Sequence, residues 1–100
     1  MKTTIKQKDD YLVVYFEGRL DTAAAPQVQQ EVKSLNDSTC EKIILDCSKL
    51  DYISSSGLRI FFGILKNAKP KGYHVYIRGI NDDLRQIFSI TGFINLFEYL

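Results

Sequence analysis

The hydrophobic and polar positions of the chain alternate between two patterns, one typical of strands and one typical of helices. Residues 11–18 (YLVVYFEG) are rich in aromatic and β-branched side chains and predict a strong strand, which a weaker strand over residues 3–8 precedes. Asp9 and Asp10 form the turn between them, and strands that are joined so tightly must be antiparallel. Three further strands are predicted over residues 42–48 (KIILDCS), 73–79 (YHVYIRG) and 96–100 (LFEYL).

The first predicted helix lies between the strands of residues 11–18 and 42–48. Pro26 must occupy its first turn, where the missing N–H costs no hydrogen bond. We therefore expect the helix to begin near residues 23–25, with Asp21 and Thr22 in the loop or cap before it. Its apolar positions recur at three- and four-residue spacing and are Ala25, Val28, Val32 and Leu35.

The second predicted helix follows a loop over residues 49–54 and ends at the KPKG segment of residues 69–72. Ile60 and Ile64 fall beside its core stripe. They either complete a broad buried face or leave an apolar strip that is suitable for docking. The predicted core stripe itself consists of Leu58, Phe61, Phe62, Leu65 and Ala68.

A third, short helix begins at Asn81 and ends at Gly92, with Asp82 and Asp83 in the first turn, where the helix dipole favours negative charge. The resulting order is β-β-α-β-α-β-α-β, and its strand–helix–strand units imply right-handed parallel crossovers. We expect an α/β fold with a small mixed sheet of four to five strands and helices mainly on one face. One hundred residues indicate a single domain over residues 1–100.

Composition and charge narrow the classes of partner. The chain has 13 basic and 12 acidic residues, a net charge of +1, which argues against direct binding of nucleic acid. Its apolar runs are shorter than the ~20 residues that span a bilayer, and the segment MKTTIKQKDD lacks the apolar core of an export signal. We therefore expect a cytoplasmic protein without a membrane segment. The near-neutral charge and scarce exposed apolar runs indicate a monomer.

The side chains that usually carry catalysis are scarce. Cys40 and Cys47 are interpreted as reduced thiols, and the only histidine, His74, cannot form a Cys/His metal site by itself. A catalytic serine would need a base within hydrogen-bond reach, and His74 lies on a separate predicted strand. We expect no metal and no cofactor, and we rank an enzyme last among the candidate functions.

The segment DYISSSGLR places Ser54, Ser55 and Ser56 before Gly57 at the start of the second helix. One serine suffices to cap a helix, and the default interpretation is that these residues form the cap and its turn. A phosphorylation site is the functional alternative, because the free N–H groups and the dipole at a helix start tolerate negative charge. Gly57 would let the backbone approach another molecule. Arg59 is either solvated or contacts a carboxylate or phosphate on a partner.

Three segments together resemble the STAS domain, specifically the anti-sigma factor antagonists of bacteria. The resemblance spans nearly the whole chain, and LDYISSSGLR is its most specific part. The three segments are GRLDTAAAP, IILDCSKLDYISSSGLRIF and LRQIFSITGFINLFEYL.

The resemblance implies partner switching. An unmodified antagonist of this family binds an anti-sigma factor that is also a serine kinase, and binding releases a sigma factor. The kinase phosphorylates a serine two positions before the glycine, here Ser55, with Ser56 as the alternative acceptor, and a PP2C-type phosphatase reverses the reaction. Asp21 matches a family aspartate at the edge of the same surface. Many members carry an aspartate where this chain has Ser54, which removes one negative charge beside the site.

The sequence therefore supports a charge-based hypothesis, in which a phosphate on Ser55 opposes binding of the kinase. A second hypothesis is a STAS domain that is not phosphorylated and serves as a small-ligand module or as part of a sensor complex or membrane transporter, with the serines acting only as caps. The residues predicted to bind a partner are Asp21, Thr22, Ser54, Ser55, Ser56, Gly57, Leu58 and Arg59.

Overall fold

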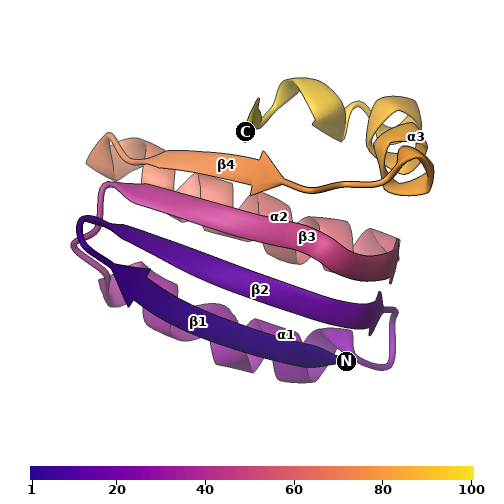
Figure 1. Cartoon of the computed structure of the whole chain (residues 1–100), viewed down its shortest axis with the longest axis horizontal. Helices are drawn as coiled ribbons and strands as arrows, with labels where there is room; N and C mark the ends of the chain where they lie inside the picture. Colours follow the sequence, from indigo (N-terminus) through magenta and orange to yellow (C-terminus); the bar gives the residue numbers. More distant parts are fainter.

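The strands form a single five-stranded sheet in the order β1-β2-β3-β4-β5 (Figure 1). This computed structural model describes the whole chain apart from the side chain of Asn36. Because neighbours in the chain are also neighbours in the sheet, the two termini lie at opposite edges. The strands are β1 (Lys2–Lys8), β2 (Tyr11–Leu20), β3 (Lys42–Ile53), β4 (His74–Arg78) and β5 (Glu98–Tyr99).

The sheet is mixed. β1 and β2 are an antiparallel hairpin, and all later pairs of neighbours are parallel. Asp9 in the hairpin turn has a positive φ of 51°, a conformation that aspartate tolerates better than most residues. The fold class predicted from the sequence is confirmed.

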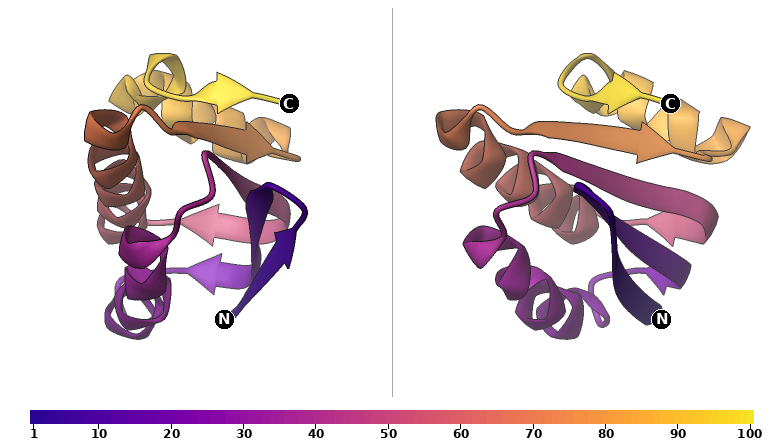
Figure 2. Two further views of the ribbon diagram at one scale, coloured as in Figure 1. Left: turned by 90° about the vertical axis from the view of Figure 1, so that its left-hand side faces the viewer. Right: turned by 60° about the vertical axis from the view of Figure 1, so that its left-hand side comes forward.

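The helices α1 and α2 cover one face of the sheet and leave the other face open (Figures 1 and 2). Each strand–helix–strand unit advances one place in the same direction, and right-handed crossovers of this kind put successive helices on the same face. α3 lies beyond the end of β4. The helices are α1 (Ala25–Glu31), α2 (Ser55–Ala68) and α3 (Asp82–Thr91), with 3₁₀ turns η1 (Val32–Asp37), η2 (Lys69–Lys71) and η3 (Phe93–Asn95).

The core lies between the sheet and the helices. Phe61 of α2 is fully buried, and its ring centroid lies 5.0 Å from that of Phe16 on β2 and 6.3 Å from that of Phe88 on α3. These aromatic contacts join the sheet to two helices, so the middle of α2 is fixed from several sides. Pairs of this geometry add to the stabilisation that burial alone gives.

Three local predictions are wrong. The predicted loop over residues 49–54 is mostly strand, because β3 passes a bulge and then pairs again with β2, as Gly18 with Leu50 and Leu20 with Ile53. The second half of the first helix is the 3₁₀ turn η1. Phe62 is 39% exposed and lies outside the core stripe.

The exposure of Phe62 follows from the way in which α2 packs. α2 packs against both the sheet and the neighbouring α1 and η1, so its buried arc extends toward α1. Ile60 and Ile64, at 3% and 5% exposure, occupy that arc, which confirms the broad buried face. Phe62 consequently points away from both neighbours.

Candidate functional site

The three serines at the start of α2 lie in three different environments. Ser54 is 8% exposed and is the N-cap: its Oγ accepts a hydrogen bond of 3.2 Å from the N–H of Gly57. The Ser54 N–H donates to the carbonyl of Leu20 at 2.8 Å. Ser54 is therefore committed to the fold as a cap, and its side chain does not belong to a contact surface.

Ser55 is the first residue of α2 and is exposed, whereas Ser56 is half-buried. In the part of the chain that the structure describes, the N–H groups of Ser55 and Ser56 have no protein acceptor, and no acidic residue occupies the first turn of α2. Unpaired N–H groups and the positive end of the helix dipole both favour an anion. The position can accept negative charge without any change in the helix.

Gly57 and Leu58 face the interior, which corrects their predicted role in partner contacts. A Cβ atom on Gly57 would lie 2.7 Å from Cγ1 of Ile53 and 2.8 Å from Cγ of Leu20. The close approach that this glycine allows is therefore to its own chain and not to another molecule. Leu58 is 3% exposed and packs in the core.

The turn between β2 and α1 lies directly beside the serines. Leu20 accepts the hydrogen bond from Ser54, and Asp21 and Thr22 follow it in the chain. The Oδ1 atom of the half-buried Asp21 accepts a hydrogen bond of 2.9 Å from the N–H of Ala24, and this contact shapes the turn before α1. Thr22 is exposed.

A hollow of about 330 Å³ connects this turn with the start of α2. Ser56 and Arg59 line it from α2, and Thr22 lines it from the turn. The structure thus brings together five of the predicted partner-binding residues, while Ser54, Gly57 and Leu58 support them from below. We call the candidate surface formed by Asp21, Thr22, Ser55, Ser56 and Arg59 the serine surface. The residues of α1 that also line the hollow are Ala25, Pro26 and Gln29.

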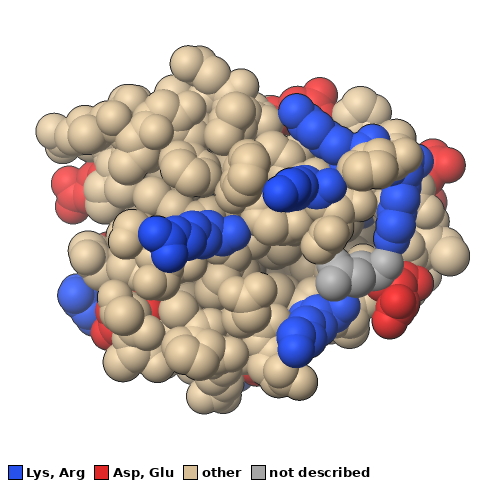
Figure 3. Space-filling view, turned by 180° about the vertical axis from the view of Figure 1, so that it is seen from behind, with Lys and Arg blue, Asp and Glu red and all other residues tan. Residues whose placement is uncertain are grey.

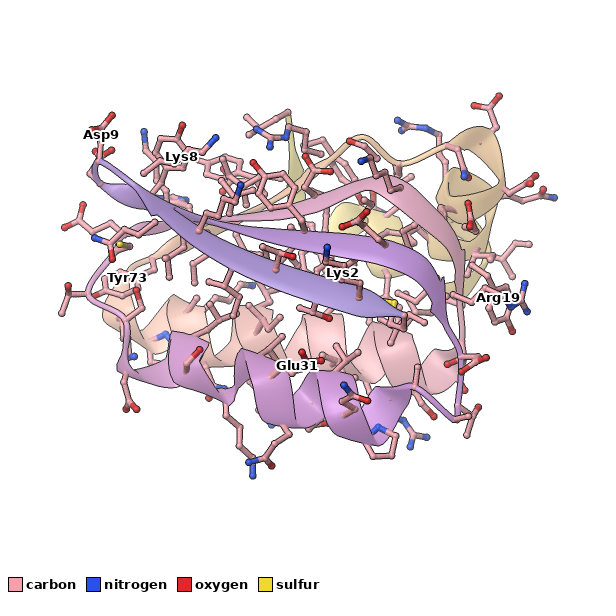
Figure 4. The ribbon with its side chains drawn as sticks, turned by 60° about the horizontal axis from the view of Figure 1, so that its bottom comes forward. Lys2, Lys8, Asp9, Arg19, Glu31 and Tyr73 are labelled. Carbon is pink, nitrogen blue, oxygen red and sulfur yellow. The ribbon has the colours of Figure 1, made fainter. Side chains whose placement is uncertain are left out.

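Sequence reasoning missed an exposed arginine near this end of the sheet. The guanidinium of Arg19 lies 4.5 Å from the ring centroid of Tyr52, a cation–π contact between the ends of β2 and β3. Figure 4 shows Arg19 near the end of β2, at the opposite end of the sheet from Asp9 and Tyr73. Only the register after the bulge pairs Arg19 with Tyr52, and the sequence alone does not fix that register.

The serine surface lacks the groups that would make a serine a nucleophile. His74 lies at the start of β4, whereas the serines follow the end of β3, and its Nδ1 atom lies 2.9 Å from a carboxylate oxygen of Glu98. Within the described residues, no three His, Cys, Asp or Glu side chains are grouped as metal ligands. No described helix has both the length and the apolar character needed to cross a bilayer.

A larger hollow lies elsewhere, on the open face of the sheet, with a volume of about 500 Å³. The buried Asp46 is one of its lining residues, and Arg78 binds Oδ2 of Asp46 through Nε and Nη2, both at 2.8 Å. Burial raises the pKa of Asp46, but the hydrogen bond from the Ser48 N–H and the nearby Arg78 outweigh it, so that the pKa lies below its ordinary value. The polar residues of the rim are Lys2, Thr4, Lys6, Tyr15, Glu17, Ser48 and Lys49.

Sequence comparisons find similar regulatory proteins. The STAS domain family matches residues 2–99. BtrV of Bordetella bronchiseptica, a candidate anti-sigma factor antagonist, is 30% identical over 97% of this chain and 84% of its own length. The anti-sigma-B factor antagonist of Listeria monocytogenes is 26% identical over 94% of this chain and 83% of its own length.

Solved structures have the same fold. A candidate anti-sigma factor antagonist from Thermotoga maritima matches 97% of this chain and 84% of its own with a TM-score of 0.88 and 22% identity. The phosphorylated form of the Bacillus cell fate determinant SpoIIAA matches 99% of this chain and 91% of its own with a TM-score of 0.75 and 16% identity.

Proposed function

Because the chain belongs to the STAS domain family, among its anti-sigma factor antagonists, we propose that it binds an anti-sigma factor and thereby frees a sigma factor. Phosphorylation of Ser55 ends this binding. The observation that carries the proposal is the exposure of Ser55 at the start of α2, beside the turn that holds Asp21 and Thr22. The anti-sigma factor is a serine kinase, and a PP2C-type phosphatase restores the unmodified form. The protein itself acts by binding rather than by catalysis.

The geometry favours Ser55 over Ser56 as the phosphate acceptor. A kinase must reach the hydroxyl and place it in its own active site, and the Ser55 side chain is exposed on the first turn of α2. Ser56 is half-buried and lines the hollow that it shares with Thr22 and Arg59. The burial of Ser54 and its role as the cap argue against it as an acceptor.

A phosphate on Ser55 would change the charge of the surface but not its shape. It adds about −1.5 to −2 charges at neutral pH. The free N–H groups of the first turn stabilise that charge, so the fold does not oppose the modification. The partner, however, then meets a strongly hydrated anion in the centre of the contact surface, and burying that anion without a matching cation is unfavourable.

The test compares the wild type with Ser55→Ala and Ser55→Asp, using the serine-kinase anti-sigma factor of the source organism. We expect Ser55→Ala to bind like the wild type and to resist phosphorylation, as judged by mass spectrometry after incubation with the kinase and ATP. Ser55→Asp should bind roughly 100-fold more weakly, which corresponds to about 3 kcal/mol.

Ser56→Ala is the matched control. It should remain a substrate of the kinase and should bind normally, because the hydroxyl that it removes is not the acceptor. Equal affinities for the wild type and Ser55→Asp, or phosphate found on Ser56 alone, would refute the proposed role of Ser55.

The hollow on the open face supports a second candidate function, a small-ligand module. Its volume of about 500 Å³ lies in the range of small-molecule sites, and Lys2 and Lys6 on its rim favour an anion, whereas Lys49 is paired with Glu17. Lys2 is labelled on β1 in Figure 4. Titration with inorganic phosphate and with citrate, followed by the amide signals of β1 to β3, tests this function. Shifts that saturate in the wild type and vanish in Lys6→Gln would support it, and no saturating shift would exclude these anions.

A further inference from the structure

The exposed edge of α2 carries a regular stripe of side chains that begins at Ser55. The exposed positions follow one another at alternating steps of four and three residues, so they lie on one side of the helix. Their opposite side packs against the sheet and α1. We call these residues the α2 stripe: Ser55, Arg59, Phe62, Lys66 and Lys69, all of them exposed.

The α2 stripe lies in a strongly basic segment. Residues 52–81 contain no Asp or Glu, although the whole chain has 12 acidic residues. Within the described part of the chain, Arg59, Lys66 and Lys69 form no ion pair. Figure 3 shows the helical face of the molecule, with Lys and Arg side chains distributed across it and acidic side chains mostly at its margins. The stripe is therefore a positively charged surface, and no described carboxylate forms an ion pair with its cations.

Phe62 places an apolar group in the middle of these cations. It is 39% exposed, and its ring packs edge-on against the ring of Phe93 with a centroid distance of 6.0 Å. This contact holds the ring in one orientation while part of its surface faces water. Aromatic anchors surrounded by charge are common in protein–protein interfaces.

We propose that the α2 stripe docks on an acidic surface of the anti-sigma factor, with an apolar site that receives Phe62. The inference rests on the proposed function and adds the chemistry of the partner's surface. Because the stripe is positively charged, charge complementarity favours an acidic partner surface. The stripe begins at Ser55, so the cations and the proposed phosphate site belong to one contact area. A protein fits better than nucleic acid, because three cations spread over about 15 Å of helix around an aromatic ring are too few to neutralise a phosphate backbone.

The stripe also explains why a phosphate on Ser55 would be effective. Ser55 and Arg59 are four residues apart on α2, where side chains of opposite charge can pair. A phosphate at position 55 would repel an acidic partner directly. It would also pair with Arg59 and so remove one of the cations that the partner needs.

The experiment measures association and dissociation rates of the unphosphorylated chain with the anti-sigma factor at several salt concentrations. Lys66 lies three turns from Ser55, so Lys66→Glu tests the stripe without touching the phosphate site. We expect Lys66→Glu to lower the association rate about tenfold at low salt, with a smaller effect at high salt, because attraction between opposite charges is screened. Phe62→Ala should instead raise the dissociation rate.

Lys8→Glu is the control, since Lys8 is an exposed cation at the end of β1 and the substitution changes the net charge equally. It should leave the association rate nearly unchanged. If Lys66→Glu and Lys8→Glu have the same effect, or if binding is independent of salt, the inference is wrong, even where Ser55→Asp still weakens binding. Absence of any binding by the wild type would refute both the inference and the proposed function. Saturable binding of duplex DNA or of anionic vesicles through Lys66, in place of the anti-sigma factor, would also overturn the inference.

Discussion

Replacing each of the two glycines of α2 by alanine should have opposite effects on stability. A Cβ atom at position 57 would lie 2.7 Å from Cγ1 of Ile53 and 2.8 Å from Cγ of Leu20, well inside ordinary contact distance. Both neighbours are essentially buried, at 2% and 0% exposure, so neither can move into solvent. At Gly63, by contrast, a Cβ atom would meet nothing within 4 Å.

The magnitudes follow from two competing terms. Alanine favours the helix over glycine by about 1 kcal/mol in both positions. Overpacking of a close-packed core costs about 1–3 kcal/mol and applies only at position 57. We therefore expect Gly63→Ala to raise the free energy of unfolding by up to about 1 kcal/mol. The free energy of unfolding of Gly57→Ala should be about 1–3 kcal/mol lower than that of Gly63→Ala.

Urea unfolding followed by circular dichroism measures both variants, and thermal unfolding gives a second readout. For a domain of this size, 1 kcal/mol shifts the melting temperature by roughly 4–8 °C, so the two variants should be clearly separated. If Gly57→Ala were as stable as Gly63→Ala, the claim that Gly57 is required by close contact with Leu20 and Ile53 would be refuted.

Three further predictions concern single groups of the fold. Ser54→Ala removes the cap of α2 and should lower the free energy of unfolding by about 1 kcal/mol, so an unchanged urea midpoint would contradict the cap. The pKa of the Asp46 carboxyl is lowered in the folded state, so the carboxylate stabilises the fold. This contribution is complete above the pKa of about 3.9 in the unfolded chain, and it is lost as the pH falls through the lower pKa of the folded state. In Asp46→Asn the free energy of unfolding should therefore fall less steeply at acid pH than in the wild type. An identical fall in the two proteins would show that the Asp46–Arg78 pair does not contribute to stability. Burial raises the pKa of the Cys47 thiol to about 12, so iodoacetamide at pH 8 should alkylate it far more slowly than in the unfolded chain, and equal rates would contradict this assignment.

Much of the fold could be predicted because local signals and tertiary packing agree. The aromatic and β-branched residues of β2, the proline at the start of α1 and the cap at Asn81 each specify a local structure that the core retains. The extension of β3 could not be predicted, since its second half pairs with β2 only after register shifts that the sequence does not reveal. The exposure of Phe62 could not be predicted, because the spacing of apolar residues along α2 does not reveal that α1 packs against one side of this helix.

The start of α2 at the three serines could be predicted from the sequence, but not the environment of each serine. The pattern SSSG marks the start of a helix, and any of its serines could have been the cap. The assignment depends on Ser54 following the last residue of β3, where its N–H meets the carbonyl of Leu20, and this is a contact between distant segments of the chain. The same contact explains why Gly57 and Leu58 face inward although their neighbours Ser56 and Arg59 line the surface.

The way in which the start of α2 is held suggests how a modification there could act. Ser54 joins α2 to β2 through the Leu20 carbonyl, its Oγ closes the first turn on Gly57, and Gly57 packs directly on the sheet. Three such contacts stabilise one arrangement of the helix start, whereas a conformational switch needs two arrangements of similar energy. A phosphate on Ser55 would therefore leave the fold unchanged and affect partner binding through its charge alone. The strength of the response then depends on the charges near the phosphate, which is why the cations of the α2 stripe matter more for the proposed regulation than any movement of the domain.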